Sequence, residues 1–400
     1  PRRLRRRRQR GYNSKIKMNT IKYFDNCATS KISDSVLDCM HQAEHDCYFN
    51  PSALYNAAAS VSAKKEAARA TVAKFMGADP AEIYFTSGGT ESNNTALFGA
   101  AKGKRGNIIS TKVEHASVYY PVAELKNRGF DVKYAPVRSD GTVSEETISA
   151  LADSETAMVA LMHVNNETGG INDIKKLCTA AKKINPKCLF VCDGVQAFGK
   201  IPVNVKNLGV DFYSVSAHKI YGPKGIGALY VKKGVGISPL IYGGGQESKL
   251  RSGTENIVGI LGFAAAVDGV KDRMKDYADR YIYLKQILND IITDKVTDFV
   301  VFSAETTAPN IFTVIFRDIK AEVILHMLED KNIIVGNGSA CSSKSMVSRV
   351  AEGIGLPRNY AEGMIRISFG SDNTDADVAL LGESLCEAVN TLRKLTRRSK

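Results

Sequence analysis

The first two thirds of the chain alternate between short apolar runs and longer stretches with apolar residues at helical spacing. The apolar runs predict buried strands at residues 82–87, 107–112, 157–164, 188–193, 211–216 and 227–232. Helices are predicted between several of them, at residues 93–102, 118–129 and 174–184. Strands that alternate with helices are typical of βαβ units. We therefore expect an α/β fold built on a mainly parallel, doubly wound sheet.

The pattern changes after about residue 257. A long helical region covers residues 257–292, and beyond it we expect a strand at 310–318, a helix at 321–331 and a strand at 364–370. This second set predicts a smaller α+β domain. We place the large domain at residues 31–268 and assemble the small domain from residues 18–30 and 269–400. The boundary then falls inside the long helical region.

The net charge of +12 points at first to nucleic acid or another acidic surface. Its distribution argues against that, because residues 1–17 hold nine Lys and Arg and residues 393–400 hold five, with no acid in either segment. The 54 bases less these 14 leave 40, against 42 acids. We expect residues 1–17 to be a disordered basic extension upstream of a natural start at Met18. A nucleic-acid-binding arm and a transit peptide are the alternatives.

Cysteine usage and hydropathy predict a protein that stays inside the cell. The eight cysteines form no C-x-x-C pair, and no signal peptide precedes them, which favours free thiols in a reducing compartment. No apolar run approaches the roughly 20 residues that a membrane-spanning helix needs. We expect a cytoplasmic protein that binds no membrane and contacts nucleic acid only through its basic extension. Targeting to an organelle by the Arg-rich N-terminus is the alternative.

Glycine and polar residues follow several predicted strands, and the carboxyl ends of parallel strands meet at one edge of a sheet. Gly88 and Gly89 follow the first strand and precede a helix, an arrangement that can hold an anion. Asp193 ends a buried strand, where a carboxylate needs a cationic partner. Lys219 follows another strand and precedes a Gly/Pro loop. The same edge receives His115, Gln196, Ser216 and His218.

Pyridoxal phosphate requires this combination of groups. Its aldehyde needs a lysine for a Schiff base, its ring nitrogen needs a carboxylate to stay protonated, and its phosphate needs backbone N–H and hydroxyl donors. Taken singly, Asp193 or Lys219 is more often an ordinary ion-pair partner. Because such groups follow successive strands, we predict a pyridoxal-phosphate site.

The chain also resembles a known family. The stretches that match, in order over about residues 22–370, are YFDNCATS, NPSALYN, IYFTSGGTESNN, EHASV, MHVNNETG, CDGVQAFGK, SAHKIYGPKGIGALY, GGGQESKLRSGTEN, GSACSS and IRISFG. They resemble the cysteine desulfurases, in the class V aminotransferase group of pyridoxal-phosphate enzymes. The resemblance implies a fold-type I PLP-transferase with a large, mainly parallel sheet domain and a smaller α+β domain.

The resemblance implies a role for each matching residue. Lys219 would bind the cofactor covalently, Asp193 would pair with the pyridinium nitrogen, and His115 would stack on the ring and carry protons. The other cofactor-binding residues would be Gly89, Thr90, Asn166, Gln196, Ser216, His218 and Thr254, the last reaching the phosphate of a neighbouring subunit. Asn166 and Arg366 would hold the substrate carboxylate, which suits the forked Arg side chain. No metal is expected.

The reaction that the resemblance implies converts L-cysteine to L-alanine. Cys341 would be catalytic together with Lys219 and His115, because its thiolate would attack the substrate sulfur and keep it as a persulfide. The family also implies a homodimer and a sulfur-acceptor protein, in iron–sulfur cluster assembly or tRNA thiolation. A selenocysteine lyase, or another class V lyase or aminotransferase, is the alternative.

Four features depart from the family pattern or divide its members. Cys27 stands where the family usually has a small residue, and either replaces alanine or adds a second thiol near the cleft. NPSALYN lacks a histidine that often follows N-P-S. Cys341 and Arg366 are 25 residues apart, as in members with a mobile cysteine loop. The chain ends at TLRKLTRRSK, whereas members that dock a scaffold protein usually continue, which leaves direct scaffold docking open.

Residues 39–47 contain a rival motif. His41, Glu44 and His45 form H-x-x-E-H, with cysteines on both sides. On a helix the two histidines share one face at zinc-ligand spacing. A zinc metallopeptidase is therefore the remote alternative, although no acidic ligand is evident downstream.

Overall fold

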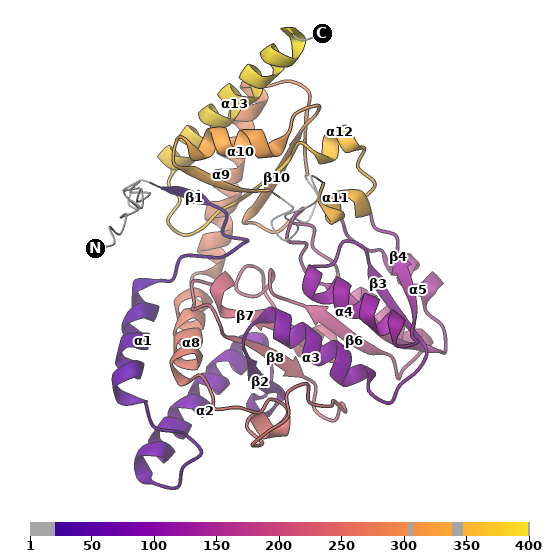
Figure 1. Ribbon diagram of the computed structural model, residues 1–400, viewed down its shortest axis with the longest axis vertical. Helices are drawn as coiled ribbons and strands as arrows, with labels where there is room; N and C mark the ends of the chain where they lie inside the picture. Colours follow the sequence, from indigo (N-terminus) through magenta and orange to yellow (C-terminus); the bar gives the residue numbers. More distant parts are fainter. Residues whose placement is uncertain (1–20, 303–306, 338–346, 399–400) are drawn as a thin grey trace, which may run out of the picture.

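A computed structural model describes residues 21–302, 307–337 and 347–398 of the protein. These residues form a seven-stranded and a five-stranded sheet, each packed against helices (Figure 1). No helix among them has the length and apolar character needed to cross a bilayer. The prediction for residues 1–17 and the position of Cys341 lie outside the described residues.

The seven-stranded sheet has the order β2-β8-β7-β6-β5-β3-β4. Its strands, in chain order, are β2 (Ile83–Thr86), β3 (Asn107–Thr111), β4 (Asp131–Ala135), β5 (Thr156–Met162), β6 (Leu189–Asp193), β7 (Phe212–Ser216) and β8 (Gly227–Val231). Strand β8 is antiparallel to both of its neighbours, β2 and β7, and the other pairings in this sheet are parallel. The six strands predicted from apolar runs are all present. Edge strand β4 was not predicted, because its sequence DVKYA is half exposed and holds no apolar run.

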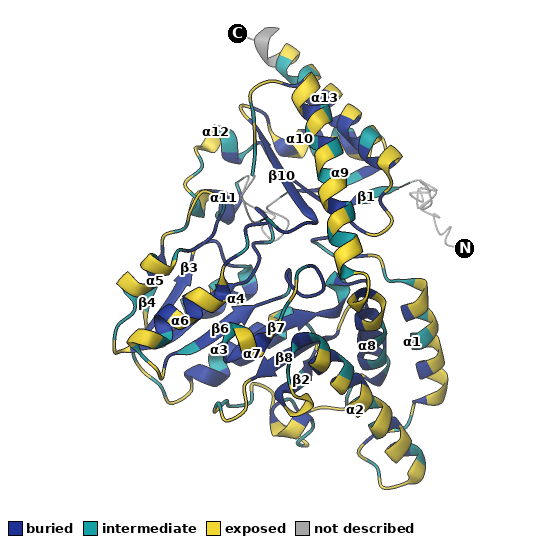
Figure 2. Cartoon of the chain, turned by 180° about the vertical axis from the view of Figure 1, so that it is seen from behind, coloured by how far each residue is buried: buried dark blue, intermediate teal, exposed yellow. Residues whose placement is uncertain are grey.

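Helices cover both faces of this sheet (Figures 1 and 2). They are α1 (Asp34–Asp46), α2 (Asn56–Met76), α3 (Gly89–Ala101), α4 (Ala116–Asn127), α5 (Glu145–Leu151), α6 (Ile174–Ile184), α7 (Val205–Leu208) and α8 (Ile257–Lys271), with short turns of 3-10 helix at Pro80–Glu82, Ala217–Lys219 and Glu247–Lys249. Neighbouring strand residues point into opposite cores: Ile108 belongs to the core that includes α3 and α4, and Ile109 belongs to the core that includes α2, α6 and α8. Strands that are apolar on both faces read as continuous runs.

The five-stranded sheet has the order β1-β11-β12-β10-β9. Its strands are β1 (Lys22–Phe24), β9 (Phe299–Val301), β10 (Ile311–Phe316), β11 (Ile333–Asn337) and β12 (Met364–Ser368). Strand β1 pairs in parallel with β11, and the other pairings are antiparallel. The accompanying helices are α9 (Met274–Lys295), α10 (Ala321–Glu329), α11 (Arg349–Gly353), α12 (Arg358–Ala361) and α13 (Asp375–Arg398). The predicted fold class, a large mainly parallel sheet beside a smaller α+β unit, is confirmed.

The region expected to be one long helix consists of two helices. Helix α8 ends at Lys271 and α9 begins at Met274. The break lets them face different cores: Phe263 and Val267 of α8 pack beneath the large sheet, whereas Leu284 and Leu288 of α9 pack beneath the small one. Our proposed domain boundary, after residue 268, falls within the last turn of α8 and stays a prediction.

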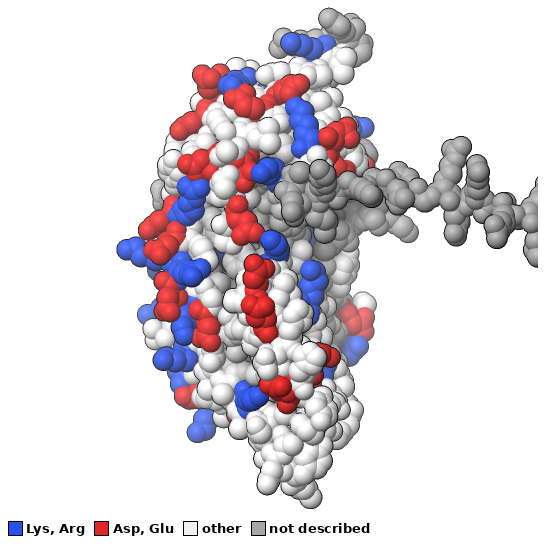
Figure 3. Space-filling view, turned by 90° about the vertical axis from the view of Figure 1, so that its left-hand side faces the viewer, with Lys and Arg blue, Asp and Glu red and all other residues white. Residues whose placement is uncertain are grey.

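Charge is mixed on one face of the described surface. Figure 3 shows Lys and Arg interspersed with Asp and Glu over one face of the molecule, with no extended area of a single sign. This distribution agrees with the near balance of charges outside the two tails.

Candidate active site

A cavity of about 360 Å³ lies at the carboxyl ends of the parallel strands. It brings together most of the predicted site residues, namely Gly89, Thr90, His115, Asn166, Asp193, Gln196, Ser216, His218, Lys219 and Arg366. Thr254 is exposed and does not line it. Residues that are far apart in the sequence therefore converge on one space, as expected for a ligand site in an α/β fold.

The glycine turn before α3 shapes one end of the cavity. Gly88 has φ of 151°, in the region that favours glycine, and a Cβ on Gly89 would lie 2.6 Å from Cγ2 of Val195. Helix α3 begins at Gly89, so the N–H groups of its first turn lack partners within the helix. The Ser216 hydroxyl lies 3.7 Å from the place of a Cβ on Gly88. These donors form a cradle that suits a phosphate group.

Asp193 lies at the end of β6 and is buried. Its Oδ2 accepts a hydrogen bond from Asn93 Nδ2 (2.8 Å), and its Oδ1 accepts one from the Val195 N–H (3.0 Å). Asn93 Nδ2 also donates to Ser117 Oγ (2.9 Å), which lies 2.7 Å from His115 Nδ1. A chain of hydrogen bonds thus connects His115 to Asp193. It fixes the carboxylate while leaving its charge available to a cation in the cavity.

His115 is the N-cap of α4. Its Nδ1 accepts a hydrogen bond from the Ser117 main-chain N–H (3.1 Å), so the neutral ring carries its proton on Nε2. Desolvation by burial lowers the pKa of His115. Burial, with the nearby Lys219 charge, also lowers the pKa of His218 to about 4. Both imidazoles are therefore neutral at physiological pH and available for proton transfer or stacking.

Lys219 ends the 3-10 turn after β7. Its Nζ donates to the main-chain oxygens of Cys27 (2.5 Å) and Ala28 (2.8 Å). Burial lowers the pKa of this amine to about 8, which favours the neutral, nucleophilic form. Cys27 is buried at the cavity wall, where its carbonyl also accepts from Gln196 Nε2 (3.0 Å) and its Sγ accepts from Asn310 Nδ2 (3.8 Å).

Arg366 reaches the cavity from β12 of the small sheet. Its Nη2 donates to Asp25 Oδ1 (2.6 Å), and its Nη1 donates to the Asn166 main-chain oxygen (2.9 Å). Its Nε and the Asn166 Oδ1 are buried and find no hydrogen-bond partner among the described residues. Such groups require a partner. A bound anion could use the Nε, and a donor group of the same ligand could use the Asn166 oxygen.

Two buried carboxyl groups at the cavity were not predicted. Burial raises the pKa of Glu114 to about 8 and that of Glu167 to about 7. Thr111 Oγ1 donates to Glu114 (2.9 Å), and Ser348 Oγ donates to Glu167. In the sequence, these two residues appear only as the acids in EHASV and NNETG, and no local pattern there indicates that they are buried. Asn93 and Ser117 were missed for the same reason.

The groups in this cavity fit pyridoxal phosphate. A phosphate cradle, a fixed carboxylate, an amine with lowered pKa and a neutral imidazole surround one space. The rival zinc motif has no such surroundings. His41, Glu44 and His45 lie exposed on α1, and no cluster of three or more metal-ligating side chains occurs among the described residues.

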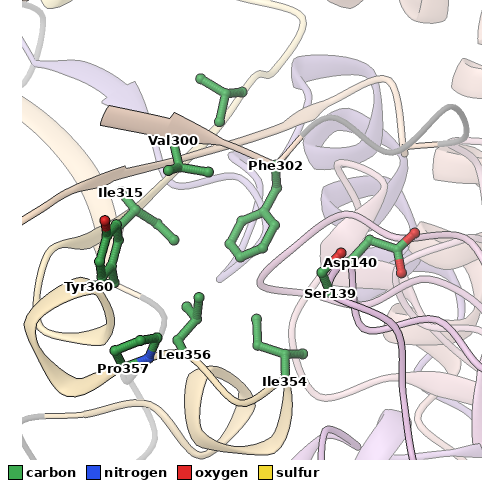
Figure 4. A pocket seen from close by; sticks show the side chains of 10 residues that line it. Ser139, Asp140, Val300, Phe302, Ile315, Ile354, Leu356, Pro357 and Tyr360 are labelled. Atoms are coloured by element: carbon green, nitrogen blue, oxygen red, sulfur yellow. The ribbon is translucent and has the colours of Figure 1, made fainter. Parts of the chain in front are cut away.

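A second cavity, of about 480 Å³, lies on the other side of α11. Figure 4 shows its mainly apolar lining, from β9, β10 and the α11–α12 segment, with Ser139 and Asp140 at one end. Arg349 and Val350 at the start of α11 line the first cavity, and Ile354 directly after α11 lines the second. The second cavity has no lysine, histidine or arginine in its lining.

The chain belongs to the aminotransferase class-V family, whose model matches residues 22–381. Among its relatives is a protein named cysteine desulfurase IscS from Dictyoglomus turgidum, 37% identical over 94% of this chain and 96% of the relative. A NifS/IcsS protein homolog from Lactobacillus delbrueckii subsp. bulgaricus is 40% identical over 88% of this chain and 93% of its own.

Solved structures agree. A NifS-like protein superposes with a TM-score of 0.86 at 36% identity, covering 92% of this chain and 99% of the other. A structure described as SspA in complex with cysteine gives a TM-score of 0.76 at 31% identity, covering 87% and 98%. The resemblance predicted from the motifs is confirmed, as are the fold class, the enzyme class and the pyridoxal-phosphate cofactor. Neither the lyase nor the metallopeptidase alternative is favoured.

Proposed function

We propose that the protein is a pyridoxal-phosphate-dependent cysteine desulfurase that converts L-cysteine to L-alanine and holds the sulfur as a persulfide on Cys341. The observation that carries this proposal is the meeting of the Lys219 amine, the Asp193 carboxylate and the Arg366 guanidinium in one cavity. The desulfurase relatives support the same substrate. The role of each residue is our inference from this geometry.

The cofactor would be held by three sets of groups. The turn at Gly89 and Thr90 and the Ser216 and His218 side chains would receive the phosphate, Asp193 would face the ring nitrogen, and Lys219 would hold the aldehyde carbon. Gln196 and His115 line the same space. When bound, pyridoxal phosphate supplies an electron sink for the carbon atoms of the substrate.

The substrate would be oriented by Arg366 and Asn166. The unpartnered Nε of Arg366 suits a carboxylate oxygen, and Asp25 and the Asn166 carbonyl hold the guanidinium in place. Lys219 would then accept the α-proton, for which a pKa near 8 is suited at neutral pH. His115, neutral and with its proton on Nε2, would exchange a proton with the substrate at that atom.

The sulfur step would balance within the enzyme and its substrate. The bond between Cβ and sulfur of L-cysteine breaks as the Cys341 thiolate forms a bond to that sulfur, and Cβ gains a proton to become the methyl group of L-alanine. The products are L-alanine and a Cys341 persulfide, with no external oxidant or reductant. An acceptor protein would then remove the sulfur, for iron–sulfur cluster assembly or tRNA thiolation in the cytoplasm.

A homodimer is part of the proposal. Thr254 lies in an exposed loop between Lys249 and α8 and does not reach the cavity of its own protomer, which is compatible with a role in a neighbouring one. Large apolar side chains are exposed in two segments. Leu240 and Tyr242 lie before Thr254 in the sequence, and Tyr48, Leu54 and Tyr55 lie between α1 and α2. In the homodimer that we propose, some of these side chains would be covered by the partner subunit.

The test is incubation of the purified enzyme with L-cysteine and a reductant, with L-alanine and sulfide measured together. Equal amounts of both are expected. Cys341→Ser should keep the visible absorbance of the bound cofactor and lose sulfide release, whereas Cys39→Ser, a change on α1 away from the cavity, serves as the matched control. Full turnover by Cys341→Ser would contradict the persulfide role.

A further inference from the structure

Tyr221 adopts a backbone conformation that is rare for its residue type. It lies two residues after Lys219 and has φ of 66°, in the left-handed region that bulky side chains avoid. Its main chain is held on both sides, because its N–H donates to Ser30 Oγ (2.7 Å) and its carbonyl accepts from the Ser33 N–H (3.1 Å). An unfavourable conformation fixed this firmly indicates a constraint on function.

The Tyr221 side chain is buried and its hydroxyl is fully engaged. It lies 2.7 Å from the Tyr281 hydroxyl on α9 and accepts a hydrogen bond from the Ser371 N–H (3.0 Å). Both partners belong to elements packed around the five-stranded sheet. The Lys200 ammonium lies 4.7 Å from the centre of the Tyr221 ring, on the side of the large sheet.

Tyr221 is a second link between the two groups that a substrate amino acid would contact, beside the Asp25–Ala28 segment that bonds to both Arg366 and Lys219. On one side Tyr221 continues the backbone of Lys219. On the other side, its hydroxyl accepts a hydrogen bond from the N–H of Ser371, which follows the strand that carries Arg366. An amino acid offers its reacting carbon and its carboxylate at a set separation, so the distance between Lys219 and Arg366 decides how well it is placed.

We propose that Tyr221 is a positioning residue, whose hydroxyl fixes the Lys219 segment relative to the Arg366 strand. The inference rests on the proposed function for the identity of the substrate, and on the hydrogen bonds of Tyr221 for the link itself.

The test compares three Tyr→Phe variants of the holoenzyme. Tyr221→Phe removes both hydroxyl contacts and should lower kcat/KM for L-cysteine about tenfold, the effect of losing two hydrogen bonds of ordinary strength. Tyr281→Phe removes only one of the two hydroxyl contacts and keeps the hydrogen bond from Ser371, so it should lower kcat/KM about threefold. Tyr277→Phe is the matched control: its ring lies in the same cluster, and its hydroxyl has no hydrogen-bond partner among the described residues.

Hydrogen–deuterium exchange gives a readout that does not require turnover. The Ser371 amide should exchange faster in Tyr221→Phe and at the wild-type rate in Tyr277→Phe, with the visible absorbance of the cofactor unchanged in both. Unchanged exchange at Ser371 in Tyr221→Phe would overturn the link. Faster exchange with wild-type kcat/KM would overturn the positioning role. Failure of the proposed function would instead appear in the wild-type enzyme, as an absence of L-alanine.

Discussion

The two cavities beside α11 differ more in chemistry than in size. The smaller one holds a lysine, two histidines, two arginines and three carboxyl groups, nearly all tied by hydrogen bonds, whereas the larger one is lined mainly by aliphatic and aromatic side chains. Volume alone would favour the larger, apolar cavity. We propose the smaller cavity as the reactive one, because convergent polar groups with shifted pKa values are typical of functional sites.

Replacement of Lys219 should abolish the reactivity that distinguishes the polar cavity from the apolar one. Lys219→Ala deletes the amine that would hold the cofactor and accept the α-proton, so turnover of L-cysteine should fall by about 10³-fold or more. The visible absorbance of the purified protein should disappear with it. Absorbance and alanine formation that both survive would show that the amine is dispensable and would contradict the assignment of the site.

Glu167→Gln tests one of the buried carboxyl groups through the pH dependence of the free energy of unfolding. The Glu167 carboxyl ionises near its ordinary pKa in the unfolded chain and at about 7 in the folded protein. Between those values the folded state holds a proton that the unfolded state releases. The free energy of unfolding should therefore fall as pH rises from about 4.5 to about 7, by up to about 3 kcal/mol from this group.

In Glu167→Gln this part of the pH dependence should vanish, as measured by urea unfolding of wild type and variant at pH 5 and pH 7. Glu352→Gln changes an exposed carboxylate on α11 and is the matched control. A pH dependence that is the same in Glu167→Gln and wild type would show that Glu167 is charged at pH 5 in the folded protein. We expect only a modest loss of activity, because Glu167 contacts Ser348 rather than the Lys219 amine.

The smallest effect on catalysis should come from the apolar cavity. Leu356→Ala removes a half-buried side chain that packs against Ile315 and its neighbours, which should lower the free energy of unfolding by about 1 kcal/mol. The kcat for L-cysteine should stay within twofold of wild type. A large drop in kcat with unchanged thermal stability would show that the two cavities are coupled through α11.

The sequence predicted the parts of the site that follow strands. Lys219, Asp193 and the Gly88–Gly89 turn could be placed because the end of a buried strand in an α/β fold points to the ligand edge. Asn93, Ser117 and Glu167 could not. Their partners come from other elements, so their hydrogen bonds arise only when the chain has folded.

The fold, like the site, could be predicted only where the signal lies within one segment of the sequence. Continuous apolar runs predicted the six buried strands, whereas β4 lacks such a run. The break between α8 and α9 arises because the two helices pack against different cores. Periodicity within one segment does not reveal this. The left-handed Tyr221 is likewise set by contacts with Ser30, Tyr281 and Ser371 rather than by its neighbours in sequence.

Strand β1 is made before every strand of the large sheet, and its partner β11 is made after all of them. The register pairs Lys22 with Ile333, and Asn26 bonds to Ser368 across 342 positions. A ribosome that adds about 5–20 residues per second leaves β1 without its partner for on the order of 15–60 s. The nascent chain therefore carries an open strand edge while the large sheet is being made, and the five-stranded sheet can close only after the strands of the large sheet have been made.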